Sequence, residues 1–303
     1  MEGCHLARPT ISVVVPALNE APTITDTISS LRETLPRGSE IIVVDDGSQD
    51  DTARNALRHG RAVRLLRSTG GLGVARARNW GAAEARGEVV AFSDAHVAVE
   101  AGTWQALVDG LIDRRVGGVA PRVIGFDTSG WGYGMSMTEP SMALDWLPKR
   151  GDESDVGHLC GCFTMFRRET FGAVGGFDGG MPCWGWEDAE LSIRLWLLGY
   201  ELRVIAAGGV AHLFRAASPY RVDPVWALHN QLRLAFAHFG VERLRTVLAR
   251  LAEHPLFDAA LERCLRSDIL SRRATLFRLR KRDDDQYFQV ARTLSVQTNH
   301  GGA

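Results

Sequence analysis

Short apolar segments alternate with longer amphipathic ones through the first hundred residues. The apolar segments have strand length and are rich in β-branched residues; they are residues 11–15, 41–44, 63–66 and 87–93. Between them the spacing predicts helices, the first with Pro22 near its start; they are expected at 23–35, 51–58 and 74–86. This alternation predicts an α/β fold with crossover units and a mainly parallel sheet covered by helices on both faces.

Polar residues gather where the predicted strands end, and ligands of parallel sheets bind beyond the carboxyl ends of the strands. The side chains expected together at this edge are Asn19, Glu20, Asp45, Asp46, Asp94 and His96. Asp94 and His96 lie two positions apart, so on extended backbone they project the same way. A carboxylate and an imidazole suit a divalent ion such as Mn²⁺.

The turn before the third helix supports a competing interpretation. Gly71-Leu72-Gly73 stands between a strand and a helix, as in dinucleotide-binding proteins, and Asp94 follows about twenty residues later. However, Arg76 occupies the third small position, and the glycines follow the third strand rather than the first. We therefore favour a nucleotide diphosphate held by a metal ion.

The middle of the chain is less regular. Strands are predicted at 119–123, 158–167, 202–205 and 210–215. Residues 130–148 are rich in glycine, methionine and aromatic residues without a clear period. Such a segment is either a binding loop or an insertion that packs Trp131 and Trp146 against the core.

A clear helix begins at Glu187, because Leu191, Leu195 and Leu198 share one face, and Gly199 ends it. Glu187 and Asp188 lie in its first turn.

The positive end of the helix dipole is expected to keep both carboxylates ionised at neutral pH, although helix capping alone would also explain them. Trp184 and Trp186 precede this pair and offer flat apolar faces for a sugar ring.

Three more helices are predicted at 225–239, 241–252 and 255–280. The chain thus divides into a domain over 1–222, with a nucleotide half at about 10–98 and an acceptor half at about 99–222, and a helical C-terminal extension over 223–303. The extension could also pair with a second copy. Residues 263–282 hold eight basic residues and one aspartate; we interpret them as a solvated face paired with acids such as 283–285, rather than as a membrane-binding helix. Residues 296–303 are expected to fray.

Composition narrows the class of protein. The 303 residues are 45% hydrophobic with a net charge of −1, which is typical of a soluble globular protein and offers no field that attracts nucleic acid. No apolar run is long enough to span a bilayer and residues 1–10 carry no signal-peptide core, so we expect a cytoplasmic protein. The five cysteines form no Cys-x-x-Cys pair and are expected to be reduced thiols.

Four motifs resemble glycosyltransferases of family 2, which have the GT-A fold. They are Pro16-Ala17-Leu18-Asn19-Glu20, Val44-Asp45-Asp46-Gly47-Ser48, Ala75-Arg76-Ala77-Arg78-Asn79 and Ser93-Asp94-Ala95-His96. With the region around Trp184, the resemblance covers about residues 10–220. It implies a Rossmann-like GT-A sheet and a nucleotide-sugar donor.

The resemblance also implies roles for particular residues. Pro16, Ala17, Glu20 and either Asp46 or Asp45 would bind the nucleoside, and Arg78 would lie near the base or the diphosphate, unless it is a helix-surface arginine. Asp188 would be the catalytic base, with Glu187 orienting donor or acceptor.

Polypeptide N-acetylgalactosaminyltransferases are similar in the Asp-x-His triplet, in Trp184-Gly185-Trp186-Glu187 and in a histidine at His212. This similarity implies that Asp94, His96 and His212 bind Mn²⁺ or Mg²⁺ together with the donor diphosphate. Those retaining enzymes carry asparagine after the glutamate, whereas this chain has Asp188.

From Asp188 we expect an inverting transferase that moves a hexose, most simply from a UDP-sugar, to a hydroxyl or thiol of a small molecule or peptide. The alternatives are a retaining enzyme like the polypeptide N-acetylgalactosaminyltransferases, a sugar nucleotidyltransferase, and a non-catalytic sugar-binding module. A nucleotidyltransferase would need a glycine-rich phosphate loop after the first strand, where residues 16–20 provide none.

Overall fold

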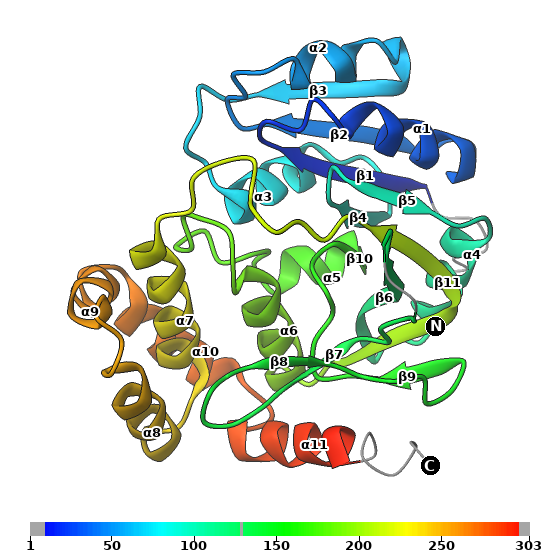
Figure 1. The fold of residues 1–303 in the computed structure, drawn as a ribbon. Helices are drawn as coiled ribbons and strands as arrows, with labels where there is room; N and C mark the ends of the chain where they lie inside the picture. The colour runs from blue at the N-terminus through cyan, green and yellow to red at the C-terminus, as the bar shows by residue number, and fades with distance from the viewer. Residues whose placement is uncertain (1–9, 128–129, 297–303) are drawn as a thin grey trace.

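The computed structural model describes residues 10–127 and 130–296. Its described residues form one nine-stranded mixed sheet in the order β3-β2-β1-β4-β10-β6-β11-β5, with β9 paired to β11 (Figure 1). The first four strands are parallel; they are β1 (Ile11–Ala17), β2 (Glu40–Asp45), β3 (Val63–Arg67) and β4 (Val89–Ser93). The predicted fold class, a mixed α/β sheet with flanking helices and a helical C-terminal part, is confirmed. Among the described strands of this sheet, four pairs are parallel and four are antiparallel.

The remaining elements complete the sheet and cover it. The other strands are β5 (Val97–Val99), β6 (Val116–Gly125), β7 (Met135–Met137), β8 (Leu144–Trp146), β9 (Glu153–Asp155), β10 (Phe163–Arg167) and β11 (Glu201–His212). The helices up to β11 are α1 (Ile24–Thr34), α2 (Thr52–Leu57), the 3₁₀ turn η1 (Gly60–Ala62), α3 (Val74–Glu84), α4 (Thr103–Gly110), α5 (Arg168–Ala173) and α6 (Glu187–Leu197). The C-terminal helices are α7 (Pro224–His238), α8 (Val241–Leu251), α9 (Phe257–Leu265), α10 (Ile269–Leu279) and α11 (Asp284–Val296).

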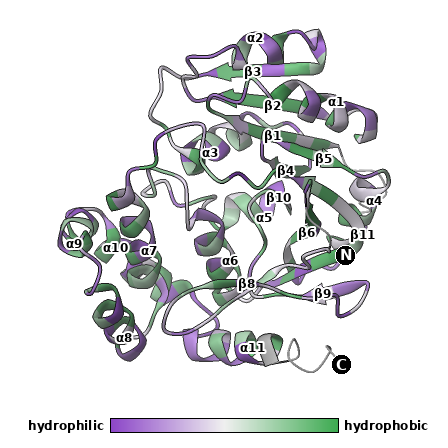
Figure 2. Cartoon of the chain, in the orientation of Figure 1, coloured by the Kyte–Doolittle hydropathy of each residue, from purple (hydrophilic) through white to green (hydrophobic). Residues whose placement is uncertain are grey.

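The central strands are apolar along their whole length because both faces of the sheet are covered. Val13 and Val15 of β1 pack in one core cluster with residues of α1 and α4, whereas Val14 packs in a second cluster with residues of α3. Figure 2 shows β1 and β2 as mainly hydrophobic ribbons. Ala17 pairs with Asp45, so β1 and β2 end side by side.

The structure departs from the predicted elements in four places. The strands expected at 202–205 and 210–215 are one strand, β11, whose register shifts between Ile205 and Gly209. The strand expected from 158 begins only at Phe163, because Phe163 N–H donates to the Cys160 carbonyl and closes a turn. The helix expected over 255–280 is divided into α9 and α10. Residues 130–148, for which no period was found, contain the β7–β8 hairpin.

We expected this segment to be either a binding loop or an insertion that packs its tryptophans against the core, and the hairpin does not fully match either expectation. Trp146 lies edge-on to Phe214, with ring centroids 6.3 Å apart, and stays 38% exposed. Trp131 lies under the Arg122 guanidinium at 4.4 Å rather than inside the core.

The C-terminal helices pack against α6 and against one another (Figure 1). The basic stretch 263–282 is only partly the solvated face that we expected. Arg272 reaches the carboxylates of Asp178 and Glu190 at 2.9 Å each, and Arg273 donates to the carbonyls of Phe236 and Phe239. Pairing of these helices with a second copy stays a prediction, as does the domain boundary at 222. The expected fraying concerns mainly 297–303, outside the described residues.

Among the described residues, no helix combines the length and hydrophobicity needed to cross a bilayer. Cys160, Cys162, Cys183 and Cys264 are free thiols, as predicted, and Cys4 lies outside the described residues.

A fully buried carboxylate in the C-terminal interface leads to a prediction about pH. Glu190 contacts Arg194 at 2.7 Å, Arg272 at 2.9 Å and His238 at 3.0 Å. Burial alone would raise the pKa of Glu190, but the arginine charges hold that pKa well below its usual range. Since folding lowers this pKa, the ionised carboxylate stabilises the fold above its unfolded pKa of about 4.3, and this stabilisation is lost as the pH falls further.

Urea unfolding measured between pH 7 and pH 3 should therefore show a steeper fall in the free energy of unfolding for the wild type than for Glu190→Gln. Parallel curves for the two proteins would contradict this assignment.

Candidate active site

A cavity of about 530 Å³ opens at the carboxyl ends of β1, β2 and β4. It is lined by Pro16, Ala17, Leu18, Glu20, Asp46, Gly71, Gly73, Val74, Ala77, Asp94, Ala95, His96, Pro182, Cys183, Trp184, His212, Leu213, Phe214, Arg215, Ser218, Pro219, Tyr220, Arg221 and Val222. This is the edge at which the sequence predicted a nucleotide site, and its volume suits a small-molecule ligand.

The structure brings Asp94, His96 and His212 together at this cavity, with one candidate ligand atom of each within 4.8 Å of the others. Asp94 and His96 follow β4, whereas His212 ends β11. His212 pairs with Val97 across antiparallel β11 and β5, which places the two imidazole centroids 4.8 Å apart.

The donor set fits a divalent cation. His212 is buried, yet within the described part of the chain neither of its ring nitrogens has a hydrogen-bond partner; its Nε2 only approaches Asp94 Oδ2 at 3.4 Å. A buried imidazole without partners is costly, and a bound ion would satisfy it. Burial would raise the pKa of Asp94, but His212 and the charge of Arg78 hold that pKa far below its usual range, so the Asp94 carboxylate is anionic.

Glu20 is held at the cavity wall by a bidentate ion pair. Arg215 donates to its two carboxylate oxygens at 2.8 and 2.6 Å, and His96 Nδ1 lies 3.2 Å from Oε1. Despite burial, these neighbours lower the pKa of Glu20 to about 2. The contact ties the segment after β11 to the end of β1.

Arg78 lies under the metal triad rather than on the surface of α3. It is 2% exposed, and its Nη2 donates to Asp94 Oδ1 at 2.9 Å and to the Gly161 carbonyl at 2.8 Å. Its Nη1 donates to Glu187 at 3.2 Å. Arg78 therefore links the end of β4 to the start of α6 and acts on the cavity through Asp94.

The two carboxylates at the start of α6 are in different states. Burial and the neighbouring Asp188 charge raise the pKa of Glu187 to about 7 against the effect of Arg78. The pKa of Asp188 is lowered, because the charge of His158 outweighs burial. Glu187 is therefore only partly ionised at neutral pH, whereas we expected the helix dipole to keep both carboxylates ionised.

The contacts of the Asp188 carboxylate are made with residues outside the cavity lining. Its Oδ2 accepts from the Gly161 N–H at 2.9 Å and lies 3.4 Å from His158 Nε2, while Oδ1 accepts from its own neighbour Ala189. Among the described residues, Asp188 is not part of the cavity lining. The carboxylate expected to face the sugar therefore lies in a contact with His158 and Gly161.

The structure separates the two aspartates after β2. Asp45 is fully buried, accepts from the Ser48 N–H at 2.9 Å and pairs with Arg67 at 3.0 Å. Asp46 lines the cavity and accepts from the N–H groups of Leu72 and Gly73 at 2.9 and 2.8 Å, so it shapes the 70–73 turn. Of the two, only Asp46 is placed to meet a nucleoside.

The two tryptophans before α6 also differ. Trp184 lines the cavity and is 56% exposed. Trp186 adopts a φ of 73° and packs against the core shared with the C-terminal helices, so it does not meet the cavity as expected. The strained backbone at Gly185 and Trp186 turns the two indoles in different directions.

The part of the cavity wall that follows Arg215 was not predicted. Residues 213–222 follow the carboxyl end of β11 and contribute Phe214, Tyr220 and Arg221 besides Arg215. Burial raises the pKa of Tyr220 above its usual range, reinforced by the charges of Asp94 and Glu187, so its phenol stays a hydrogen-bond donor. The sequence feature that could have indicated this wall is Ser218-Pro219-Tyr220 between Arg215 and Arg221, shortly after the end of β11.

Comparison with known proteins decides the family. Residues 12–175, more than half of the chain, match the family model of glycosyl transferase family 2. The chain belongs to this family. It is a glycosyltransferase. Residues 148–216 of this glycosyltransferase also match the model described as the N-terminal domain of galactosyltransferase.

Its relatives by sequence are polypeptide N-acetylgalactosaminyltransferases. Polypeptide N-acetylgalactosaminyltransferase 13 of Homo sapiens is 31% identical over 250 residues, which are 73% of this chain and 45% of the relative. Polypeptide N-acetylgalactosaminyltransferase 12 of Mus musculus is 32% identical over 251 residues, covering 75% and 43%. The glycosyltransferase thus spans less than half the length of these relatives.

Solved structures support the GT-A fold. The structure of GalNAc-T7 with UDP, GalNAc and Mn²⁺ superposes with a TM-score of 0.68 at 24% identity, over 86% of this chain and 54% of that one. A mannosyltransferase from Pyrobaculum calidifontis, in complex with GDP-Man and Mn²⁺, gives 0.52 at 21% identity, over 89% and 85%.

These relatives correct the expected reaction. We expected an inverting hexosyltransferase because position 188 holds aspartate. The sequence relatives are instead polypeptide N-acetylgalactosaminyltransferases, which favours the retaining alternative. The contacts of Asp188 with His158 and Gly161 are consistent with this correction, since they occupy the carboxylate expected to act as the base.

Proposed function

We propose that the glycosyltransferase moves N-acetylgalactosamine from UDP-N-acetylgalactosamine to a serine or threonine hydroxyl of a peptide, with retention of the anomeric configuration. The observation that carries the proposal is the convergence of Asp94, His96 and His212 on one cavity. It occurs in a chain whose relatives are named for this transfer.

The donor would bind across the ends of β1, β2 and β4. Pro16, Ala17 and Asp46 lie on the side of the cavity made by β1 and β2 and would meet the nucleoside. The diphosphate would lie toward the triad, where Arg215 and the protonated Tyr220 supply donors from the opposite wall.

Mn²⁺ is the proposed cofactor, held by Asp94, His96 and His212, and it would supply positive charge to the departing diphosphate. Arg78 would keep the Asp94 carboxylate ionised and oriented from below. Arg215 would hold residues 213–222 against Glu20 and so limit the access of water to the donor.

The test is transfer from UDP-N-acetylgalactosamine to a panel of peptides containing serine or threonine, with Mn²⁺. We expect a glycopeptide by mass spectrometry and an NMR coupling constant that shows the same anomeric configuration as the donor. An inverted linkage, or transfer to small-molecule acceptors but to no peptide, would contradict the proposal. Omitting the peptide should leave only slow release of UDP.

The two tryptophans offer a matched comparison. Trp184→Ala removes an exposed indole at the cavity rim, so we expect the KM for acceptor peptide to rise about tenfold with little change in the free energy of unfolding, since exposed substitutions are usually within about 0.5 kcal/mol. Trp186→Ala removes an indole packed against the core and should lower stability by about 2 kcal/mol or more. Steady-state kinetics and urea unfolding measure both, and equal effects of the two variants on KM would refute the different placement of the indoles.

A further inference from the structure

Residues 178–186, here called the 178–186 loop, lie between α5 and α6 and carry Trp184 at the cavity rim. The loop lies between α3 and the C-terminal helix α7. On one side, Arg76 Nε donates to the Gly179 carbonyl at 2.7 Å. On the other side, Arg233 and Asn230 of α7 and Arg272 of α10 contact the loop, and all three lie outside the predicted domain over 1–222.

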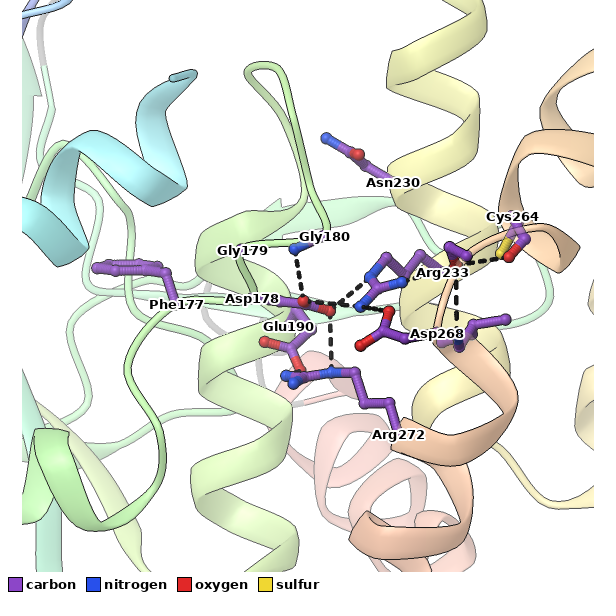
Figure 3. Close-up of polar contacts among 12 residues, drawn as sticks. Phe177, Asp178, Gly179, Gly180, Glu190, Asn230, Arg233, Cys264, Asp268 and Arg272 are labelled. Atoms are coloured by element: carbon purple, nitrogen blue, oxygen red, sulfur yellow. Dashed lines mark hydrogen bonds and ion pairs between the residues drawn. The ribbon is translucent and has the colours of Figure 1, made fainter. Parts of the chain in front are cut away.

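A buried charge cluster of Asp178, Arg233 and Arg272 holds the first turn of the loop in place (Figure 3). Asp178, 2% exposed, lies between Arg233 of α7, at 2.7 and 3.0 Å, and Arg272 of α10, at 2.9 Å. Asp178 also accepts from the Gly180 N–H at 2.9 Å. A Cβ on Gly180 would lie 2.2 Å from the Arg233 Cζ, so the guanidinium rests directly on the backbone of the loop.

Asn230, one helical turn before Arg233, holds the second half of the loop through hydrogen bonds. The side chain of Asn230 is fully buried, and its Nδ2 donates to the carbonyls of Cys183 and Gly185 at 3.1 and 2.9 Å. Figure 3 shows Asn230 on the same helix as Arg233, above the charge cluster.

Gly185, whose carbonyl accepts from Asn230, also contacts Glu187 and so connects the loop to the centre of the site. The Gly185 N–H donates to Glu187 Oε2 at 2.8 Å, while Glu187 Oε1 accepts from Arg78 at 3.2 Å. Arg78 in turn pairs with Asp94 of the metal triad. Four hydrogen-bonded contacts thus join Asn230 of α7 to Asp94 of the triad. Neither Asn230 nor Arg233 belongs to the described cavity lining.

We infer that Asn230 and Arg233 are positioning residues for glycosyl transfer, which act through the 178–186 loop by holding Trp184 at the rim and orienting Glu187. The inference rests on the proposed function. It makes the C-terminal helices part of the transferase site. The nucleoside end of the cavity, made by β1 and β2, lies outside this chain of contacts.

Asn230→Asp tests the inference, because it keeps the size of the side chain but turns an oxygen toward two carbonyls. We expect kcat for transfer to the peptide to fall ten- to a hundredfold, since small displacements of a site can cost that much. The dissociation constant of UDP with Mn²⁺ should stay within about twofold. Hydrogen–deuterium exchange should become faster in the peptides covering 179–187, where Gly180 and Gly185 donate, and stay unchanged in β1.

Two matched controls separate positioning from loss of stability. Gln231→Glu introduces the same change of charge at the next, partly exposed position of α7 and should leave kcat unchanged. Arg233→Met should lower kcat in the folded protein. Arg243→Met should lower only stability; it removes another arginine that pairs with several carboxylates, those of Glu139, Asp284 and Asp285.

The inference is overturned if Asn230→Asp transfers at the wild-type rate, if exchange in 179–187 does not change, or if Arg243→Met lowers kcat as much as Arg233→Met. Should Arg233→Met fail to fold, the Asn230→Asp results decide alone. Should the wild type transfer no sugar to any peptide, the proposed function fails, while the exchange measured in Asn230→Asp still supports or overturns the role of α7 in holding the loop.

Discussion

His212→Gln is expected to lower the rate of glycosyl transfer at least about a hundredfold and to weaken binding of Mn²⁺. The imidazole has no other partner among the described residues, so its removal takes away a proposed ligand. A metal ion contributes several kcal/mol of charge stabilisation to the transition state, and each 1.36 kcal/mol corresponds to about tenfold in rate. Isothermal titration with Mn²⁺ and steady-state kinetics measure the two effects.

The matched control is His59→Gln, which replaces a partly buried histidine beside Arg32, far along the chain from the triad. This variant should bind Mn²⁺ and transfer sugar like the wild type. Removing metal from the wild type with EDTA should reproduce the loss seen in His212→Gln, and adding Mn²⁺ should restore activity only in the wild type. Full activity of His212→Gln would remove this residue from the metal site.

Arg78→Met is expected to have the largest effect on stability. Arg78 is the buried cation between Asp94 and Glu187, and removing one partner of a buried ion pair typically costs about 3–5 kcal/mol because the remaining charge is left without compensation. For a chain of this size the melting temperature should fall by about 5–8 °C. The loss should be smaller at pH 5 than at pH 8, because burial already raises the pKa of Glu187 to about 7 and a protonated carboxyl needs no cation.

Arg64→Met serves as the comparison. Arg64 also pairs with two carboxylates, Glu40 at 3.1 Å and Glu84 at 2.8 Å, but its side chain is 30% exposed. Water replaces such partners, so we expect a loss of about 1 kcal/mol or less. Calorimetry of both variants at the two pH values measures the loss in the free energy of unfolding. Similar losses for Arg78→Met and Arg64→Met would contradict the larger contribution that we assign to the buried Arg78.

Much of the nucleotide half could be predicted from local sequence. The strands β1, β2 and β4 are largely apolar because both faces are buried, and the Asp-Asp and Asp-x-His motifs lie at or directly after the ends of β2 and β4. Parallel strands end at one edge of the sheet, so the convergence of Glu20, Asp46 and Asp94 follows from strand order alone.

The placement of side chains around α6 could not be predicted in this way. Helix position and the dipole argued that Glu187 and Asp188 are equivalent, but Glu187 faces Arg78 in a buried site and Asp188 faces His158 and Gly161. Motif spacing likewise treated the two tryptophans as equal. The left-handed backbone at Trp186 sends its indole into the core of the C-terminal helices.

The sequence alone therefore determined the α/β class, the edge of the sheet at which the cavity opens and the placement of Asp94 beside His96, since these depend on strand periodicity and on short motifs. The addition of His212 to this pair came from the resemblance to polypeptide N-acetylgalactosaminyltransferases. The tertiary structure decided which of two neighbouring carboxylates or indoles faces the cavity, that residues 213–222 form its outer wall, and that α7 holds the 178–186 loop. These features depend on contacts between residues up to about two hundred positions apart, such as Arg215 with Glu20. Burial and pairing, which decide the charge and direction of each group, exist only after the chain has folded.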